Sequence, residues 1–187
     1  MKTEKPMSNY VLTIFFASLL CACSFVIIPL PLGISLAIQD MIAILNGILL
    51  GALYGGLSIL IFLFIGGIGL PVFTGKGGFQ IILNGPTGGI LIGYFFGAII
   101  AGLITKIFMN KKNTNNFYEY FIFTISTLIG FAIIFIFGIF GFSYNTGTEL
   151  QKSIYVILIP FIPVTIIKSI LIILISKKFY KVVKNYL

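Results

Sequence analysis

The sequence lacks the residues on which most soluble enzymes depend. It contains no histidine, two cysteines and four acidic residues, and no two acids lie close enough along the chain to suggest a catalytic pair. Hydrolytic acid–base chemistry and metal binding therefore lack their usual side chains. Cys21 and Cys23 lie two residues apart, on different faces of a helix, and imply no disulfide framework. We expect a protein that is not an enzyme and that has no cofactor.

Charge is scarce as well. Charged residues make up 9% of the chain and hydrophobic residues 59%, with a mean hydropathy of +1.16, which excludes a soluble domain. Arginine is absent, so all twelve basic residues are lysines and the net charge is +8. This charge does not indicate nucleic acid, because nine of the lysines flank apolar runs: Lys2, Lys5, Lys106, Lys111, Lys112, Lys177, Lys178, Lys181 and Lys184. The positive-inside rule then places both termini in the cytoplasm.

The apolar runs predict an all-α integral membrane protein with six transmembrane helices in one domain, residues 1–187. A span needs roughly 20 apolar residues, and this length leaves little for an extramembrane domain. Hydropathy and breaker residues predict helices at 9–28, 36–54, 55–68, 87–109, 117–142 and 153–179. Residues 20–23 (LCAC) also resemble a bacterial lipoprotein cleavage box, but the apolar run continues past them. The first run is therefore interpreted as a retained span.

The glycine-rich stretch between helices 3 and 4 is the most unusual part of the sequence. Residues 66–93 hold ten of the 21 glycines together with two prolines, a composition that cannot propagate a helix. The stretch is nevertheless too apolar for a solvated loop. Irregular backbone at membrane depth must pack on protein or line a wet cavity. We therefore predict an extracellular lid loop that folds back over a pocket.

Lys168 is the strongest functional signal in the chain, because no other lysine lies so deep in an apolar run. The competing interpretation is that its ammonium group reaches the membrane interface along its methylene stem. Asp40 lies early in helix 2, in the same outer half, where a lone acid is a little more often an interfacial residue than a site residue. We hypothesise that Asp40 pairs with Lys168 across the pocket. Thr165 lies on the same helical face as Lys168.

Other candidates belong to the lid. The amide of Asn84 can both donate and accept hydrogen bonds, which suits a ureido, amide or carboxyl group, although capping helix 4 explains it equally well. Phe73 and Phe79 could form an apolar wall over a ligand or simply pack.

Small residues at four-residue spacing in helices 2 and 4, such as Gly47 and Gly97, predict close internal helix packing. Prolines 160 and 163 are expected to delay or kink helix 6.

Together these motifs resemble a known family. Residues 69–73 (GLPVF), a glycine-rich turn and residues 83–89 (LNGPTGG) resemble the signature of the BioY family, the biotin-binding membrane subunits of energy-coupling factor (ECF) transporters. The Pro-Phe-Ile-Pro segment with Lys168 is similar to the last motif of that family, and Gln39 stands where the family usually has a glutamine. Two positions depart from it, since Thr165 replaces the usual aspartate and Ile90 the usual aromatic residue.

The resemblance implies a subunit in a bacterial plasma membrane that captures biotin from outside. Its partners would be a transmembrane coupling (T) protein and two cytoplasmic ATPases. The candidate ligand-binding residues are Lys168, Asn84, Thr165, Gln39, Asp40, Thr87, Phe73 and Phe79, and the lid residues are Pro71, Val72, Gly75, Gly77 and Gly78. Three alternatives stay open: capture of another small vitamin-like carboxylate, a membrane scaffold without a ligand, and a self-sufficient channel or exchanger. The last predicts polar residues in both leaflets, whereas the inner half is expected to be almost purely apolar.

Overall fold

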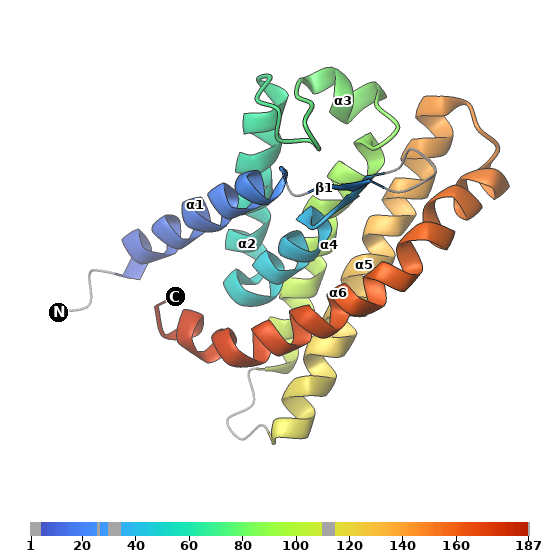
Figure 1. Ribbon diagram of the computed structural model, residues 1–187. Helices are drawn as coiled ribbons and strands as arrows, with labels where there is room; N and C mark the ends of the chain where they lie inside the picture. The colour runs from blue at the N-terminus through green and yellow to red at the C-terminus, as the bar shows by residue number, and fades with distance from the viewer. Residues whose placement is uncertain (1–4, 26, 30–34, 110–114, 187) are drawn as a thin grey trace.

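The computed structural model describes residues 5–25, 27–29, 35–109 and 115–186, and these form a bundle of long helices (Figure 1). The helices are α1 Lys5–Cys23, α2 Gln39–Gly67, α3 Phe79–Asn84, α4 Gly88–Phe108, α5 Asn116–Thr146 and α6 Leu150–Tyr186. A short antiparallel hairpin, β1 Ile27–Pro29 and β2 Ser35–Ala37, joins α1 to α2.

The predicted membrane fold is confirmed. Helices α4, α5 and α6 are each long and apolar enough to cross a membrane, and α2 is so over its full 29 residues although it is interrupted at Gly51, whereas the apolar part of α1, Ser8–Cys23, is shorter. In lipid, a helix satisfies its own backbone hydrogen bonds, so long apolar runs fold this way. The six predicted helices correspond to α1, the two arms of α2, α4, α5 and α6. The single domain and the exposure of the lid to the outside stay predictions.

Helix α2 reverses direction at Gly51. This residue has φ +80° and ψ 175°, which glycine adopts far more readily than other residues. Asn46 lies before the reversal and Ser58 after it, and a straight helix would separate them by about 18 Å. Instead, the Asn46 side-chain amide donates a 2.9 Å hydrogen bond to the Ser58 hydroxyl. The two arms of α2 therefore lie against each other, and the boundary predicted between the helices 36–54 and 55–68 lies instead at Gly51.

Helix α4 lies between α2 and α5 at the centre of the bundle (Figure 1). Small residues allow this close packing: a Cβ on Gly47 would lie 2.0 Å from the carbonyl oxygen of Ala98, and one on Gly89 would lie 2.2 Å from that of Phe137. Glycine at these positions lets backbones approach within contact distance. The predicted internal packing through small residues is thus confirmed for α2 and α4.

The predicted ends of three helices are wrong. Helix α1 ends at Cys23, where the Ser24 hydroxyl bonds back to the Cys21 carbonyl, and the chain continues into β1. Residues 35–37 pair in the hairpin, so α2 starts at Gln39 rather than at 36. Helix α6 starts at Leu150 and continues through Pro160 and Pro163, so the prolines do not delay it. The packing of α6 on α5 and α2 outweighs the lost backbone donors.

The expectation of an almost purely apolar inner half is also wrong. Buried polar residues occur there, and two pairs of them bond to each other across the bundle. Besides the Asn46–Ser58 bond, the Thr105 hydroxyl of α4 donates to the Ser126 hydroxyl of α5 at 2.9 Å. Such bonds hold helices together in lipid. These particular pairs therefore stabilise the bundle and do not by themselves indicate a channel.

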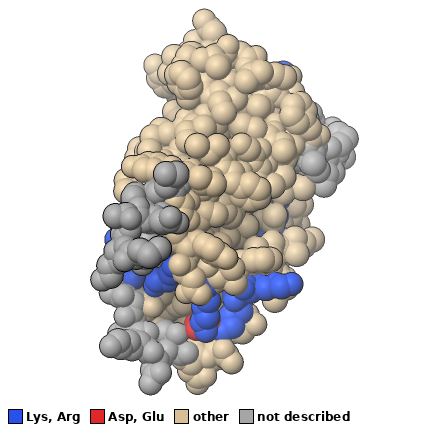
Figure 2. Space-filling view, turned by 90° about the vertical axis from the view of Figure 1, so that its left-hand side faces the viewer, with Lys and Arg blue, Asp and Glu red and all other residues tan. Residues whose placement is uncertain are grey.

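The bundle has two different ends. At the lid end, α3 and the preceding loop cover the tops of α2 and α4 (Figure 1). At the opposite lysine end lie Lys106, Lys177, Lys178, Lys181 and Lys184, and Figure 2 shows basic side chains gathered there. Lys177 and Lys181 both pair with the buried carboxylate of Glu119, which joins α5 to α6. Three other lysines used to predict the topology, Lys2, Lys111 and Lys112, lie outside the described residues.

Candidate functional site

Two polar residues open α2 at the lid end, and both are buried. Gln39 is 2% exposed and Asp40 is 3% exposed, so neither is an interfacial side chain. The preceding hairpin leads the chain into the bundle and places the first turn of α2 within it. Burial of an amide and a carboxylate is costly unless each finds a partner. Their partners come from the two segments singled out by the sequence, the lid and α6.

Asp40 forms an ion pair with Lys168. The lysine Nζ lies 2.8 Å from both carboxylate oxygens, and Lys168 is itself only 6% exposed. The predicted pairing is confirmed, whereas the pocket expected at this pair stays a prediction, and the interpretation of Lys168 as an interfacial lysine is wrong. The geometry also explains the burial, because each charge compensates the other in a medium where an isolated ion is unstable. The pair is electrically neutral as a unit.

Thr165 lies one turn before Lys168 on α6 and is also buried. Its backbone carbonyl accepts a 2.7 Å hydrogen bond from the Ser169 hydroxyl. Its own hydroxyl, Oγ1, has no partner among the described residues. Buried hydroxyls normally have one, so this oxygen is available for a hydrogen bond beside the ion pair.

The lid is a tight turn anchored to the bundle. Phe73 and Lys76 exchange two backbone hydrogen bonds, of 2.8 and 3.1 Å, around Thr74 and Gly75. Both central residues have positive φ, as in a type I′ turn. The Gln39 side-chain amide donates a 2.7 Å hydrogen bond to the Val72 carbonyl, which ties the lid to the residue next to Asp40.

Two lid side chains insert into the protein. Val72 is 5% exposed and Phe73 is 2% exposed, whereas Pro71 and Gly75 remain at the surface. The Phe73 ring lies on Gly66 of α2 and meets the Phe62 ring edge-on, with 5.4 Å between centroids. The Phe73 ring thus holds the lid against the part of α2 that follows Gly51. Glycine is required at position 77 of the lid, because a Cβ there would lie 2.3 Å from the Leu70 carbonyl oxygen.

The remaining candidates lie outside this cluster. Asn84 is exposed at the end of α3, and its amide donates a 3.2 Å hydrogen bond to Gln80 on the same helix. The interpretation of Asn84 as a helix cap is wrong, since Thr87 occupies the N-cap of α4. Thr87 is itself exposed. Phe79 is 52% exposed and packs on Gly67. The described contacts bring together Gln39, Asp40, Lys168 and the Val72 carbonyl, and leave Asn84, Thr87 and Phe79 at the surface.

Tyr94 is a residue that the sequence analysis missed. It lies on α4, is 5% exposed and stands within electrostatic range of the Asp40 carboxylate. Its position could have been found from spacing, because it follows Ile90 by four residues and shares that face of the helix.

The cluster suits a neutral ligand with both donors and acceptors. Asp40 offers carboxylate oxygens, Lys168 offers ammonium protons, and Thr165 offers a free hydroxyl. A ligand carboxylate placed here would add a negative charge to a neutral buried pair, which is unfavourable in a low-dielectric setting. A group such as a cyclic urea could bond to both members of the pair without adding charge.

Comparison with known proteins identifies close relatives of the whole chain. The model of the BioY family matches residues 1–185. The biotin transporter BioY of Thermotoga maritima is 33% identical over 156 residues, which cover 82% of this chain and 86% of that protein. The biotin transporter BioY of Rhizobium etli is 30% identical over 165 residues, 87% of each chain.

A solved structure matches as well. It is the S-component for biotin from an ECF-type ABC transporter, which shares 28% sequence identity and superimposes with a TM-score of 0.84. The match covers 97% of this chain and 95% of that one. Sequence and fold therefore agree over nearly the full length.

Proposed function

This chain belongs to the BioY family, and from that premise we propose that it is the biotin-capturing S subunit of an ECF-type transporter. The observation that carries the proposal is the buried Asp40–Lys168 pair directly beneath the lid anchor Gln39. Ionisable residues buried within a membrane bundle usually mark a ligand or ion site, and this pair lies next to the lid.

We assign the ureido ring of biotin to this pair. The ring carries two N–H donors and one carbonyl acceptor, so Asp40 accepts from an N–H group while Lys168 donates to the carbonyl oxygen. The free Thr165 hydroxyl supplies a further hydrogen bond, and Asp40 takes over the acceptor role of the aspartate that the family usually has at position 165. The neutral pair favours this group over a carboxylate, which argues against a different vitamin-like carboxylate bound at Lys168.

The lid closes over the ligand. The lid would release from the bundle when the Gln39–Val72 hydrogen bond and the Phe73 contact open together, with the Gly78–Gly66 backbone hydrogen bond as its hinge, and would reseal above bound biotin. Enclosure strengthens the hydrogen bonds below by excluding water. The exposed Asn84, Thr87 and Phe79 would reach the ligand only through a movement of α3.

The partners and orientation follow from the same proposal. Delivery of biotin requires a transmembrane T protein and two cytoplasmic ATPases, with the lid end outside a bacterial plasma membrane and both termini in the cytoplasm. The gathering of lysines at the end opposite the lid supports this orientation through the positive-inside rule (Figure 2).

Binding of radiolabelled biotin to the purified full chain tests the function. Wild type should bind, and Lys168→Ala should bind at least about 100-fold more weakly, because it leaves Asp40 unpaired and removes a donor. Lys152→Ala, which removes an exposed lysine at the lid end, is the matched control and should bind as wild type. Circular dichroism and gel filtration would separate lost binding from lost folding. A folded wild-type chain that does not bind biotin would overturn the proposal.

A further inference from the structure

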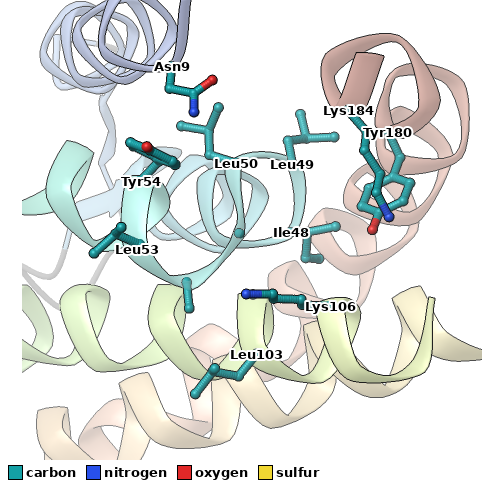
Figure 3. A pocket seen from close by; sticks show the side chains of 13 residues that line it. Asn9, Ile48, Leu49, Leu50, Leu53, Tyr54, Leu103, Lys106, Tyr180 and Lys184 are labelled. Atoms are coloured by element: carbon teal, nitrogen blue, oxygen red, sulfur yellow. The ribbon is translucent and has the colours of Figure 1, made fainter. Parts of the chain in front are cut away.

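A cavity lies at the lysine end, away from the lid. Its volume is about 590 Å³, within the roughly 300–1,000 Å³ of small-molecule sites. It forms where α2 reverses at Gly51, between α1, α4 and α6. Figure 3 shows Asn9 of α1 on one side, Tyr180 and Lys184 of α6 on another, and Lys106 of α4 below the turn.

The cavity carries positive charge that no described acid neutralises. Lys106 and Lys184 both line it, and neither has an ion-pair partner within the described part of the chain. Asp40 and Glu119 are occupied by other lysines, and Glu149 lies at the lid end just before α6. The fourth acid, Glu4, lies outside the described residues. The positive potential of two lysines at one apolar cavity therefore favours the binding of an anion.

Buried polar atoms in the same cavity support this conclusion. The Asn9 side chain is 9% exposed, and its Oδ1 has no hydrogen-bond partner among the described residues. Because Oδ1 can only accept, for example from a headgroup hydroxyl, the group that can donate to an anion is the amide nitrogen, which points toward the cavity in Figure 3. Tyr180 is 7% exposed, with the Lys184 ammonium 5.4 Å from its ring centroid. An amide and a phenol thus accompany the two cations, which is the donor set of an oxyanion site.

The apolar part of the wall continues onto the outside of the bundle. Leu53 and Leu103 line the cavity and are 67% and 43% exposed. In a membrane such side chains face lipid tails, so a molecule could hold its polar group inside while its chains stay in the bilayer. A small soluble anion would gain nothing from this wall.

We propose that the cavity binds the headgroup of an anionic phospholipid of the leaflet at the lysine end. Lys106 and Lys184 hold the phosphate, Asn9 and Tyr180 bond to its oxygens or to the headgroup hydroxyls, and Leu53 and Leu103 contact the first part of the acyl chains. Basic pockets between transmembrane helices bind such headgroups. The lipid bridges α1, α4 and α6 at the reversal of α2, and the site is separate from the one assigned to biotin.

Thermal unfolding of the purified full chain in neutral detergent tests the site. Dioleoylphosphatidylglycerol should raise the unfolding temperature saturably, and dioleoylphosphatidylcholine should not. In the variant Lys106→Gln/Lys184→Gln the apparent Kd for the anionic lipid should rise roughly 30-fold, since each lysine near a headgroup contributes a factor of about five. Each single variant should show a smaller rise, so the result does not depend on the double variant folding.

Lys178→Gln is the matched control, because it removes a lysine from the same end that does not line the cavity, and its Kd should stay within about twofold of wild type. Biotin binding should be unchanged in all of these variants, so this test fails independently of the transport proposal. Equal stabilisation by the two lipids, or an equal loss in Lys178→Gln, would overturn the proposal. Equal protection by millimolar inorganic phosphate would do so too, since it would identify a soluble anion.

Discussion

At the scale of single residues, the site depends on the compensation of two buried charges. Replacing Asp40 by Asn keeps the shape but leaves the Lys168 ammonium buried without its carboxylate. Removing one member of a buried pair costs about 3–5 kcal/mol. We expect Asp40→Asn to lower the unfolding temperature and to weaken biotin binding. Glu149→Gln removes an exposed acid and should change neither. Wild-type values for Asp40→Asn in both measurements would show that the pair is dispensable.

A substitution of Thr165 can distinguish a ligand-binding role of this residue from a structural one. Its hydroxyl has no partner within the described residues, so Thr165→Val removes a polar atom that stabilises nothing identified in the bundle. We expect an unchanged or higher unfolding temperature without biotin, together with a biotin Kd that is about tenfold higher. The expected weakening corresponds to one lost hydrogen bond. If the variant lost stability but kept wild-type affinity, Thr165 would be a structural residue.

At the scale of elements, the lid is attached to the bundle by the Gln39 side-chain hydrogen bond, by the Phe73 ring and by a 2.7 Å backbone hydrogen bond from Gly78 to Gly66. Gln39→Ala removes the donor to the Val72 carbonyl and leaves that buried oxygen unpaired, at a cost of about 1–3 kcal/mol. The closed lid should lose population, and biotin should dissociate about tenfold faster in stopped-flow or filter-release experiments. Gln80→Ala, an exposed glutamine on α3, is the control and should release biotin at the wild-type rate. An unchanged dissociation rate in Gln39→Ala would mean that the lid does not limit release.

The reversal of α2 depends on one backbone conformation. Alanine at position 51 would be strained at φ +80° by about 1–2 kcal/mol, although its Cβ would meet no atom within 4 Å. We expect Gly51→Ala to lower the unfolding temperature through backbone strain alone. Gly130→Ala is the comparison, because that glycine has no positive φ and its nearest neighbours would lie at 3.3 Å or more. If the two variants were equally stable, the reversal would not require glycine.

At the scale of the whole molecule, the sequence predicted what hydropathy and charge determine. Apolar runs of sufficient length had to form helices, and two opposite charges within the bundle had to meet, so the Asp40–Lys168 pair was foreseeable. Interactions between segments that lie far apart in the sequence could not be predicted in this way. The β1–β2 hairpin moved the start of α2, and tertiary packing carried α6 through Pro160 and Pro163. The cavity at the lysine end arises from four helices, none of which shows it alone.

The broadest prediction is that this chain alone binds biotin, whereas transport requires the T protein and the ATPases. Buried polar residues occur in the inner half, but the bonds of Asn46 with Ser58 and of Thr105 with Ser126 lie between helices and close the bundle. We therefore expect the purified chain in sealed vesicles to bind biotin without releasing it inside. Addition of the T protein and both ATPases with ATP should produce uptake against a gradient.

The control for that experiment is the folded Thr165→Val variant, which should lose uptake in proportion to its weaker binding. A counterflow measurement distinguishes ATP-driven transport from a self-sufficient channel or exchanger, since the latter would equilibrate labelled biotin across the vesicle membrane without ATP. If the chain alone equilibrated biotin at a rate proportional to the amount of protein, the inner helix contacts would have to open during the cycle. The Asn46–Ser58 bond would then be part of a pathway, and Asn46→Leu would block flux while leaving surface binding intact.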